Sequence, residues 1–278
     1  MQELRRQYPI ADLLKLVKLP RSTFYYQLGL QGRRDKDKSL KDTIQAVFCC
    51  HKGRYGYRRI TSAIRQSGVR INHKVVQRLM RVLGLKSLVR PKKYRAFKDE
   101  AGRVAPNVLQ RQFKAMTPNQ KWVTDVTEFS VLGEKLYLSP VLDLFNGEII
   151  AFETNRRPVF EMVSSMLKKA LSRLKPDERP LLHSDQGWQY RMPAYRRQLQ
   201  ERQLVQSMSR KGNCYDNAVM ESFFGTLKSE FYYLNKFTNV EELRAGLKDY
   251  IHYYNHERGK LKLKGLSPVQ YRIQALAA

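Results

Sequence analysis

The stretch KWVTDVTEFSV (residues 121–131) carries the clearest structural signal in the chain. It alternates apolar and polar side chains and is rich in β-branched residues, a pattern that predicts a strand with one buried face. Asp125 stands in the middle of this predicted strand, where an acid is unusual. Turn residues follow at LGEK and NGE, so the runs 135–145 and 148–155 are predicted to complete a three-strand meander.

A second acid closes the next predicted strand. A helix is expected over 159–174, and LLHSDQGWQY (181–190) then gives a short strand, 179–185, that ends at Asp185. An ordinary turn Asp would also fit, since Asp-x-Gly is common turn chemistry. A crossover connection can lay this strand parallel beside the first one, which brings Asp125 and Asp185 onto neighbouring strands. With a helix over 193–203 and a strand over 204–209, the pattern indicates a mixed α/β sheet.

A third acid lies on the helix predicted over 217–230, in DNAVMESFFGTLKSE (216–230). Met220, Phe224 and Leu227 form an apolar stripe, with Glu221 at its edge. Three carboxylates suit Mg²⁺, and a pair of such ions can cleave a phosphodiester by holding the attacking and leaving oxygens. We expect Asp125 to bridge two ions, with Mn²⁺ as a possible substitute, and Asp185 and Glu221 each to hold one. Two nearby residues have open roles: Lys228 contacts a phosphate or is a surface lysine, and Asn217 supports the site or caps the helix.

Charge points to a polyanionic partner. The 278 residues contain 52 Lys and Arg against 25 Asp and Glu, a net charge of +27, which is typical of proteins that bind nucleic acid. Residues 1–120 hold 28 basic and 7 acidic residues, so most of the excess lies there. The sequence has no membrane-length apolar run and no signal peptide pattern, and its three unpatterned cysteines fit a reducing cytoplasm. Neither Cys49-Cys50-His51 nor the pair His252 and His256 has the pattern of a zinc site, and both histidines are expected on a helix surface.

The basic N-terminal part is predicted to be helical. Residues 11–27 outline a short helix, a Leu-Pro break and a second helix, and three further helices are expected over 37–48, 54–68 and 72–84. Asn72 can cap the last of these helices, which should bury Val75, Val76, Leu79 and either Val82 or Leu83. Its exposed face carries Lys74, Gln77, Arg78 and Arg81, which suit base edges and phosphates. A plain solvated face would look the same.

The acid motifs resemble those of a known family. Glu221 follows Asp185 by 36 positions, as in the D,D(35)E motif of retroviral integrases and related transposases. The segments WVTDVTEF (122–129), HSDQGWQY (183–190), SRKGNCYDNAVMESFFGTLKSE (209–230) and YYNHERGKLKLKGLSPVQY (253–271) are similar to the insertion-sequence family called "IS three". Within it, the chain is most similar to the downstream-frame product of the "one-fifty" subgroup. RYGYRRI (54–60) matches the family's helix–turn–helix-like region, which makes Arg58 and Arg59 further candidate DNA contacts.

The resemblance implies an RNase H-like integrase core, a mixed five-stranded sheet with helices, preceded by a helix–turn–helix-like DNA-binding region. The expected domains are a helix–turn–helix-like segment (1–30), a helix–turn–helix-like domain (31–90), a basic linker (91–117), the core (118–235) and a basic helical tail (236–278). The resemblance further implies Mg²⁺-dependent cleavage at transposon ends and strand transfer into target DNA. The implied partners are double-stranded DNA, at least one more copy of the chain on DNA, and an upstream-frame product with a leucine zipper. No sustained heptad is present, so we expect that upstream part to be absent.

Two other functions remain open at this stage. The chain could be a non-catalytic DNA-binding regulator in which the acids are structural. It could also be an RNase H or junction-resolving nuclease, with the same core and metals but no strand transfer. The intact acid triad argues against the regulator, and the basic N-terminal part and lysine-rich tail favour long duplex DNA over RNA–DNA hybrids.

Overall fold

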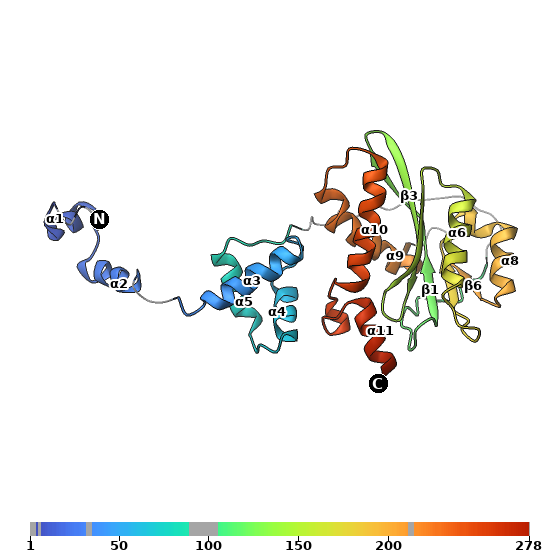
Figure 1. Ribbon diagram of the computed structural model, residues 1–278, viewed down its shortest axis with the longest axis horizontal. Coiled ribbons are helices and arrows are strands. Elements are labelled where there is room, and N and C mark those ends of the chain that lie inside the picture. Colours follow the sequence, from blue (N-terminus) through green and yellow to red (C-terminus); the bar gives the residue numbers. More distant parts are fainter. Residues whose placement is uncertain (1–3, 5–6, 32–34, 89–104, 211–213, 278) are drawn as a thin grey trace. The chain divides into compact units, whose positions relative to one another are not determined.

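The computed structural model describes residues 4, 7–31, 35–88, 105–210 and 214–277 (Figure 1). The chain forms two compact units, residues 1–45 and 46–278, so the division falls inside a helix. The first unit contains α1 (Ile10–Leu16), α2 (Arg21–Gln31) and the start of α3 (Lys38–Cys50). The predicted helix, Leu-Pro break and second helix are therefore confirmed, and Leu14 and Phe24 are the buried side chains of the pair. Most of the predicted linker, 91–117, lies outside the described residues.

Two more helices follow α3, namely α4 (Tyr57–Gln66) and α5 (His73–Val82). Asn72 caps α5 as predicted, because its Oδ1 accepts a hydrogen bond of 2.9 Å from the Lys74 N–H. The exposed face of α5 is also confirmed. Val76 and Leu79 are buried as predicted, Val75 and Leu83 are partly buried, and Val82 is exposed. Met80 is buried in addition. Helix α5 begins one residue later and ends two residues earlier than predicted, which leaves Val82 at a solvent-facing terminus.

The second unit is built on one sheet. In the described part of the chain it has six strands: β1 (Lys121–Thr124), β2 (Thr127–Val131), β3 (Glu134–Asp143), β4 (Ile149–Asn155), β5 (Leu181–Ser184) and β6 (Gln206–Met208). β2, β3 and β4 form the predicted antiparallel meander. β1 also pairs antiparallel with β3, beyond the part of β3 that β2 covers. β5 pairs parallel with β1, as predicted, and β6 pairs parallel with β5.

The prediction of a single strand over 121–131 was wrong. The strand is interrupted at Asp125 and Val126, so Asp125 follows the end of β1 and does not lie mid-strand. The Asp125 side chain provides the physical reason, because its Oδ1 accepts a hydrogen bond of 2.7 Å from the next residue's N–H, at Val126. A backbone donor used in this way is lost to the strand ladder. β1 and β2 lie successively along the same edge of β3, which explains six strands where five were expected.

Helices cover both faces of the sheet (Figure 1). α6 (Phe160–Leu171) and α8 (Pro193–Glu201) pack on one face, where Trp122, Val141 and Ile150 meet the apolar side of α6. α9 (Ala218–Glu230) and α10 (Val240–His256) pack on the other face against Val123 and Phe129. Short helices complete the unit: α7 (Trp188–Arg191), which the sequence did not predict, and the 3₁₀ turns Cys214–Asn217, Tyr232–Leu234 and Leu261–Leu263. Burial of both faces matches the apolar character of the central strands.

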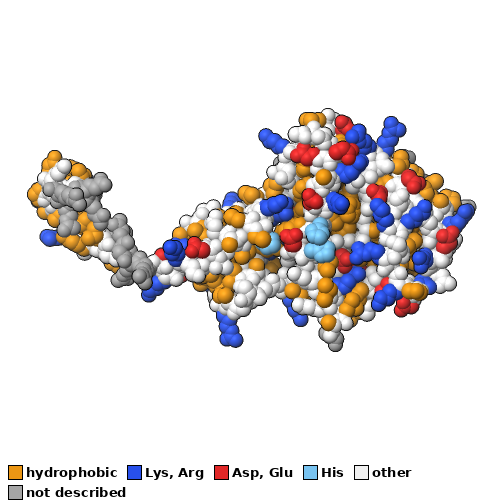
Figure 2. All heavy atoms as spheres, in the orientation of Figure 1, with side chains coloured by type: hydrophobic (Ala, Val, Ile, Leu, Met, Phe, Trp, Pro, Cys, Tyr) orange, Lys and Arg blue, Asp and Glu red, His pale blue; other side chains and the backbone are white. Residues whose placement is uncertain are grey.

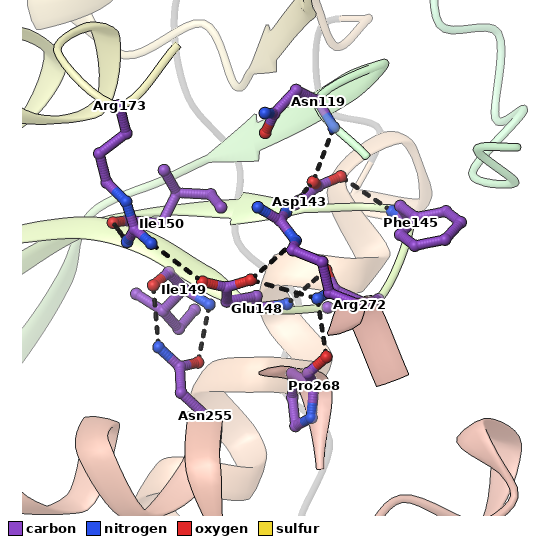
Figure 3. Close-up of polar contacts among 12 residues, drawn as sticks. Asn119, Asp143, Phe145, Glu148, Ile149, Ile150, Arg173, Asn255, Pro268 and Arg272 are labelled. Carbon is purple, nitrogen blue, oxygen red and sulfur yellow. Dashed lines mark hydrogen bonds and ion pairs between the residues drawn. The ribbon is translucent and has the colours of Figure 1, made fainter. Parts of the chain in front are cut away.

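The last helix, α11 (Pro268–Ala277), is tied to the β3–β4 turn by buried charges (Figure 3). Its Arg272 pairs with Asp143 and, at 3.0 Å, with Glu148. Both carboxylates are buried, at 0% and 3% exposure. Asn255 of α10 donates to and accepts from the backbone of Ile149, each at 2.9 Å. The predicted helical tail is thus packed on the core at this point.

The surface carries mixed charge. Figure 2 shows Lys and Arg side chains spread over the visible face, with carboxylates among them. His252 and His256 are exposed on α10, as predicted, and their rings stack with centroids 4.5 Å apart. None of the described helices combines the length and the apolar character that a membrane span requires.

Candidate active site

The two predicted aspartates leave the sheet side by side. β1 and β5 run parallel, with Trp122 opposite Leu182 and Val123 opposite His183. Two residues further in this register, Asp125 stands opposite Asp185, just beyond the last residue of each strand. The carboxyl ends of neighbouring parallel strands meet at one edge of a sheet, which is where α/β proteins place their sites. The sheet therefore brings together two acids that are 60 positions apart in the sequence.

The backbone after β5 holds the Asp185 carboxylate in place. Its Oδ1 accepts a hydrogen bond of 2.9 Å from the N–H of Gly187, which is also the residue before α7. A Cβ at position 187 would lie 3.0 Å from that same Oδ1 and 3.3 Å from the ring of Tyr190. Glycine is therefore favoured here by close approach and not by backbone conformation, since its φ is −51°.

We expect Gly187→Ala to lower the rate of the site's reaction about tenfold with little loss of stability, because the carboxylate has to shift by a few tenths of an ångström. Rate and DNA affinity measured on the same preparation would check this. A variant with full activity, or one in which binding fell as much as rate, would contradict the inferred role of Gly187.

Glu221 lies close enough to Asp125 for its charge to act on that carboxyl. It is exposed near the start of α9, while its neighbours Met220 and Phe224 are buried, and α9 packs on β1. The pKa of Asp125 is raised well above its ordinary value, first by burial, then by the negative charge of Asp185 and, more weakly, by that of Glu221. The three predicted acids thus act on one another electrostatically. Among the described residues, no three His, Cys, Asp or Glu side chains are gathered so that they could hold a metal ion.

Lys228 and Asn217 also lie at the site. Burial lowers the pKa of Lys228, while the charges of Glu128 and Asp125 act to raise it, and its Nζ lies 5.2 Å from the centre of the Phe129 ring. Asn217 precedes α9 but does not cap it with its side chain. Instead its Nδ2 donates a 3.3 Å hydrogen bond to the carbonyl of Thr124, the residue before Asp125. Its buried Oδ1 has no hydrogen-bond partner among the described residues.

His183 is a structural residue that the sequence analysis left without a role. It is fully buried between β5 and β6, with Nδ1 2.8 Å from Ser207 Oγ and Nε2 3.1 Å from Ser209 Oγ. Ser207 Oγ already accepts two backbone N–H bonds, from residues 108 and 109, so its own proton goes to Nδ1. The proton of His183 then sits on Nε2. Burial lowers its pKa to about 4, so the ring is neutral at pH 7.

Asp216 is a second residue that the sequence analysis missed. It is completely buried, and its carboxylate accepts hydrogen bonds from Arg210, Arg111 and Asn107. Burial alone would raise the pKa of Asp216, but the arginine and backbone donors outweigh burial and lower it. Asp216 thereby fixes residues 107–111 next to the start of α9. Nothing in the spacing of these residues indicates the contact, because 105 positions separate Arg111 from Asp216.

The predicted DNA contacts fall into two groups. The first group shares the exposed face of α5 and consists of Lys74, Gln77, Arg78 and Arg81. The second lies on α4. Arg58 is exposed there, whereas Arg59 is partly buried and forms a 3.0 Å ion pair with Glu230. The described contact of Arg59 is therefore within the protein.

Two aligned aspartates at the end of a mixed α/β sheet, with a glutamate on the helix that follows, define an integrase-type catalytic core. Residues 115–214 and 221–276 match family models described as integrase core domains, and residues 34–93 match an HTH-like domain. The chain is 55% identical to the putative transposase InsK of IS150 from Escherichia coli K12, over 99% of this chain and 97% of that protein. It is 32% identical to the InsF transposase of IS3A from the same organism, over 100% and 98%.

The chain belongs to the family of insertion-sequence transposases that includes those of IS150 and IS3A. It carries the helix–turn–helix-like DNA-binding domain and the RNase H-like core of that family. Among solved structures, the catalytic core domain of HTLV-2 integrase is similar, at 18% identity and a TM-score of 0.46, covering 56% of this chain and 98% of that one.

Proposed function

We propose that this chain cleaves DNA at the ends of a transposon and joins the freed strand to target DNA, using Asp125, Asp185 and Glu221 as the catalytic acids. The observation that carries the proposal is the β1–β5 register, which sets the two aspartates opposite each other at one sheet edge. The charge of Glu221 acting on Asp125 supports the third member. Membership of a transposase family makes DNA the substrate class.

The donor set fits Mg²⁺, with Mn²⁺ as a substitute, because all three candidate ligands are carboxylates and hard divalent cations prefer oxygen. Like charges crowd Asp125, so a bound cation would relieve their repulsion. The unpartnered Oδ1 of Asn217 is a further oxygen at the end of β1. Among the described residues, the three carboxylates are not close enough together to hold an ion. Their side chains would therefore move together when an ion binds. When bound, two such ions would activate the attacking oxygen and stabilise the leaving one.

The chain's own residues would supply position and charge. Asp125, Asp185 and Glu221 would together hold the ions. Lys228 is partly buried beside Asp125, where an ammonium group can hold a phosphate of the DNA backbone. On α5 the exposed Lys74, Gln77, Arg78 and Arg81 would contact the terminal repeats, and Arg58 would add a phosphate contact. In a bacterium, this DNA lies in the cytoplasm.

The direct test is an assay on labelled DNA that contains the transposon ends, with Mg²⁺, comparing the wild type with Glu221→Gln. We expect joined strand-transfer products from the wild type only, because glutamine keeps the size of the side chain and removes its charge. Cleavage without joining would favour a nuclease. If the wild type binds the ends without any reaction, and adding a fused upstream-frame segment does not change this, the chain is a DNA-binding regulator.

We also propose that at least two copies of the chain act together, because transposition requires both ends to be held at once. Sedimentation of the protein with an end-containing duplex should show two or more protomers per complex. A complex with a single protomer under conditions that support strand transfer would refute the dimer.

A further inference from the structure

The segment that precedes α4 is built into the C-terminal part of the second unit. Arg54 is buried, and its guanidinium lies 4.7 Å from the ring centre of Tyr253 and 5.5 Å from that of Tyr250, both on α10. The His51 ring stacks on Tyr55 at 3.7 Å. The Tyr55 hydroxyl in turn accepts a 2.8 Å hydrogen bond from the N–H of residue 259. The RYGY part of the helix–turn–helix-like motif therefore makes protein contacts.

One buried carboxylate joins three helical segments at this place. Glu230, the last residue of α9, is 3% exposed. It receives two hydrogen bonds from Arg258, at 2.7 and 2.6 Å, one from Arg59 of α4 at 3.0 Å, and one from the Tyr250 hydroxyl at 3.1 Å. Paired donors on both oxygens of a carboxylate fix its direction as well as its charge.

Helix α4 also packs closely on the turn that follows Arg258, where two residues lack a side chain. A Cβ on Gly265 would lie 2.2 Å from Ser62 Oγ, and one on Gly259 would lie 2.4 Å from the carbonyl oxygen of Gly265. Gly265 has a φ of +86°, a conformation that suits glycine. We call the contact of residues 51–66 with Glu230 and residues 250–265 the junction.

The junction connects the two working parts of the chain. On one side, α4 packs on α5, which carries the exposed basic face. On the other side, Glu230 ends the helix that holds Glu221 and Lys228. A helix of 13 residues is a stiff rod of about 20 Å, so fixing one end restrains the other.

We propose that Arg59 and Glu230 are positioning residues, which hold the DNA-binding helices α4 and α5 at a fixed offset from the catalytic acids of the same chain and thereby set the phosphodiester that is cut. This inference rests on the proposed function. It assigns Arg59 to the junction and not to DNA contact. Glu230 is buried, so its effect on cleavage would not come from contact with DNA.

The first variant is Arg59→Ala in the full chain, which leaves Glu230 paired with Arg258 and Tyr250. We expect affinity for the end duplex to stay within about twofold, while the rate of correct cleavage falls about tenfold and cuts spread to neighbouring positions. Arg156→Ala is the matched control, because Arg156 forms an exposed ion pair with Glu134 and should change neither readout. Weaker binding with cuts at the single normal position would show that Arg59 contacts DNA and would overturn the proposal.

The second variant locks the junction by a disulfide. Ser62 Cβ lies 3.4 Å from the place of a Cβ at position 265, near the separation of about 3.5–4.5 Å found in disulfides. Ser62→Cys with Gly265→Cys, in a chain whose Cys49, Cys50 and Cys214 are serine, is compared oxidised and reduced. The reduced chain measures the cost of placing a side chain at the +86° φ of position 265. The oxidised chain should cut at the normal position. When the same disulfide is added to the Arg59→Ala chain, oxidation should restore cutting at a single position. An oxidised chain that is inactive until reduced, or no rescue of Arg59→Ala, would overturn the junction. A wild type that binds ends but never cuts would instead overturn the proposed function.

Discussion

Asp185→Asn is expected to lower the rate of cleavage of end-containing DNA by about a thousandfold, the upper end of the loss found when one preorganised electrostatic group is removed from an active site. Asparagine can still accept the hydrogen bond from the Gly187 N–H, so the turn after β5 should keep its shape. The side chain loses its negative charge and with it most of the affinity that a carboxylate has for a divalent cation. Gel-shift and cleavage assays on the same DNA would measure both properties.

Binding supplies the control for this variant. Affinity for the duplex should stay within about twofold of the wild type, because we propose that phosphate contacts made by α5 dominate it. Arg78→Ala on the exposed face of α5 should do the reverse, weakening binding and lowering its salt dependence. If Asp185→Asn cleaves at more than about a hundredth of the wild-type rate, Asp185 is not a ligand of the metal ions.

Glu230→Ala is expected to lower the free energy of unfolding by about 3–5 kcal/mol, because it leaves the buried guanidinium of Arg258 without a counter-charge. Arg258 is 5% exposed and Glu230 is 3% exposed, so water cannot replace the lost partner. Chemical denaturation at pH 7 would measure the loss. Glu230→Leu combined with Arg258→Met should recover most of it, since apolar pairs can replace buried ion pairs. A single variant as stable as the wild type would show that the pair is not coupled to folding.

The same carboxylate makes stability depend on pH. Burial alone would raise the pKa of Glu230, but the hydrogen bonds and charge of Arg258, with a smaller effect of Arg59, outweigh burial and lower it. A carboxyl whose pKa is lower in the folded than in the unfolded chain stabilises the fold above the unfolded value of about 4.5 and loses that effect as pH falls. The wild type should therefore lose more stability than Glu230→Ala on going from pH 6 to pH 4.

Local patterns predicted the elements that position the acids. β-branched alternation located β1, and an apolar run before Asp185 located β5, so their parallel pairing followed from topology. The break after Asp125 was not predictable from that alternation, since β2 continues the same pattern after two residues. A hydrogen bond between a side chain and the next N–H leaves no periodic signal. On α5, the 3.6-residue period gave the exposed face correctly but missed the buried Met80.

The contacts that join distant segments could not be predicted. Arg59 and Glu230 are 171 positions apart, and their pairing depends on how α4 packs beside residues 250–265. Arg59 therefore looked like one more basic residue in a basic region. The roles of His183 and Asp216 could not be predicted either, because their partners lie on other strands and loops. Buried polar networks are set by tertiary packing, which single-sequence patterns do not encode.

The anchoring of α11 bears on the order in which the protein is made. A ribosome builds the β3–β4 turn, with Asp143 and Glu148, more than a hundred residues before it reaches Arg272. Until Arg272 is made, Asp143 lacks the ion pair that this residue provides, and Glu148 has its contact with Arg173 alone, so the turn is without part of its final packing. The helix–turn–helix-like region, by contrast, leaves the ribosome first and holds its own short-range contacts. During synthesis the α4–α5 pair can therefore form before the second unit is complete, while its contacts with Glu230 and residues 250–265 form last.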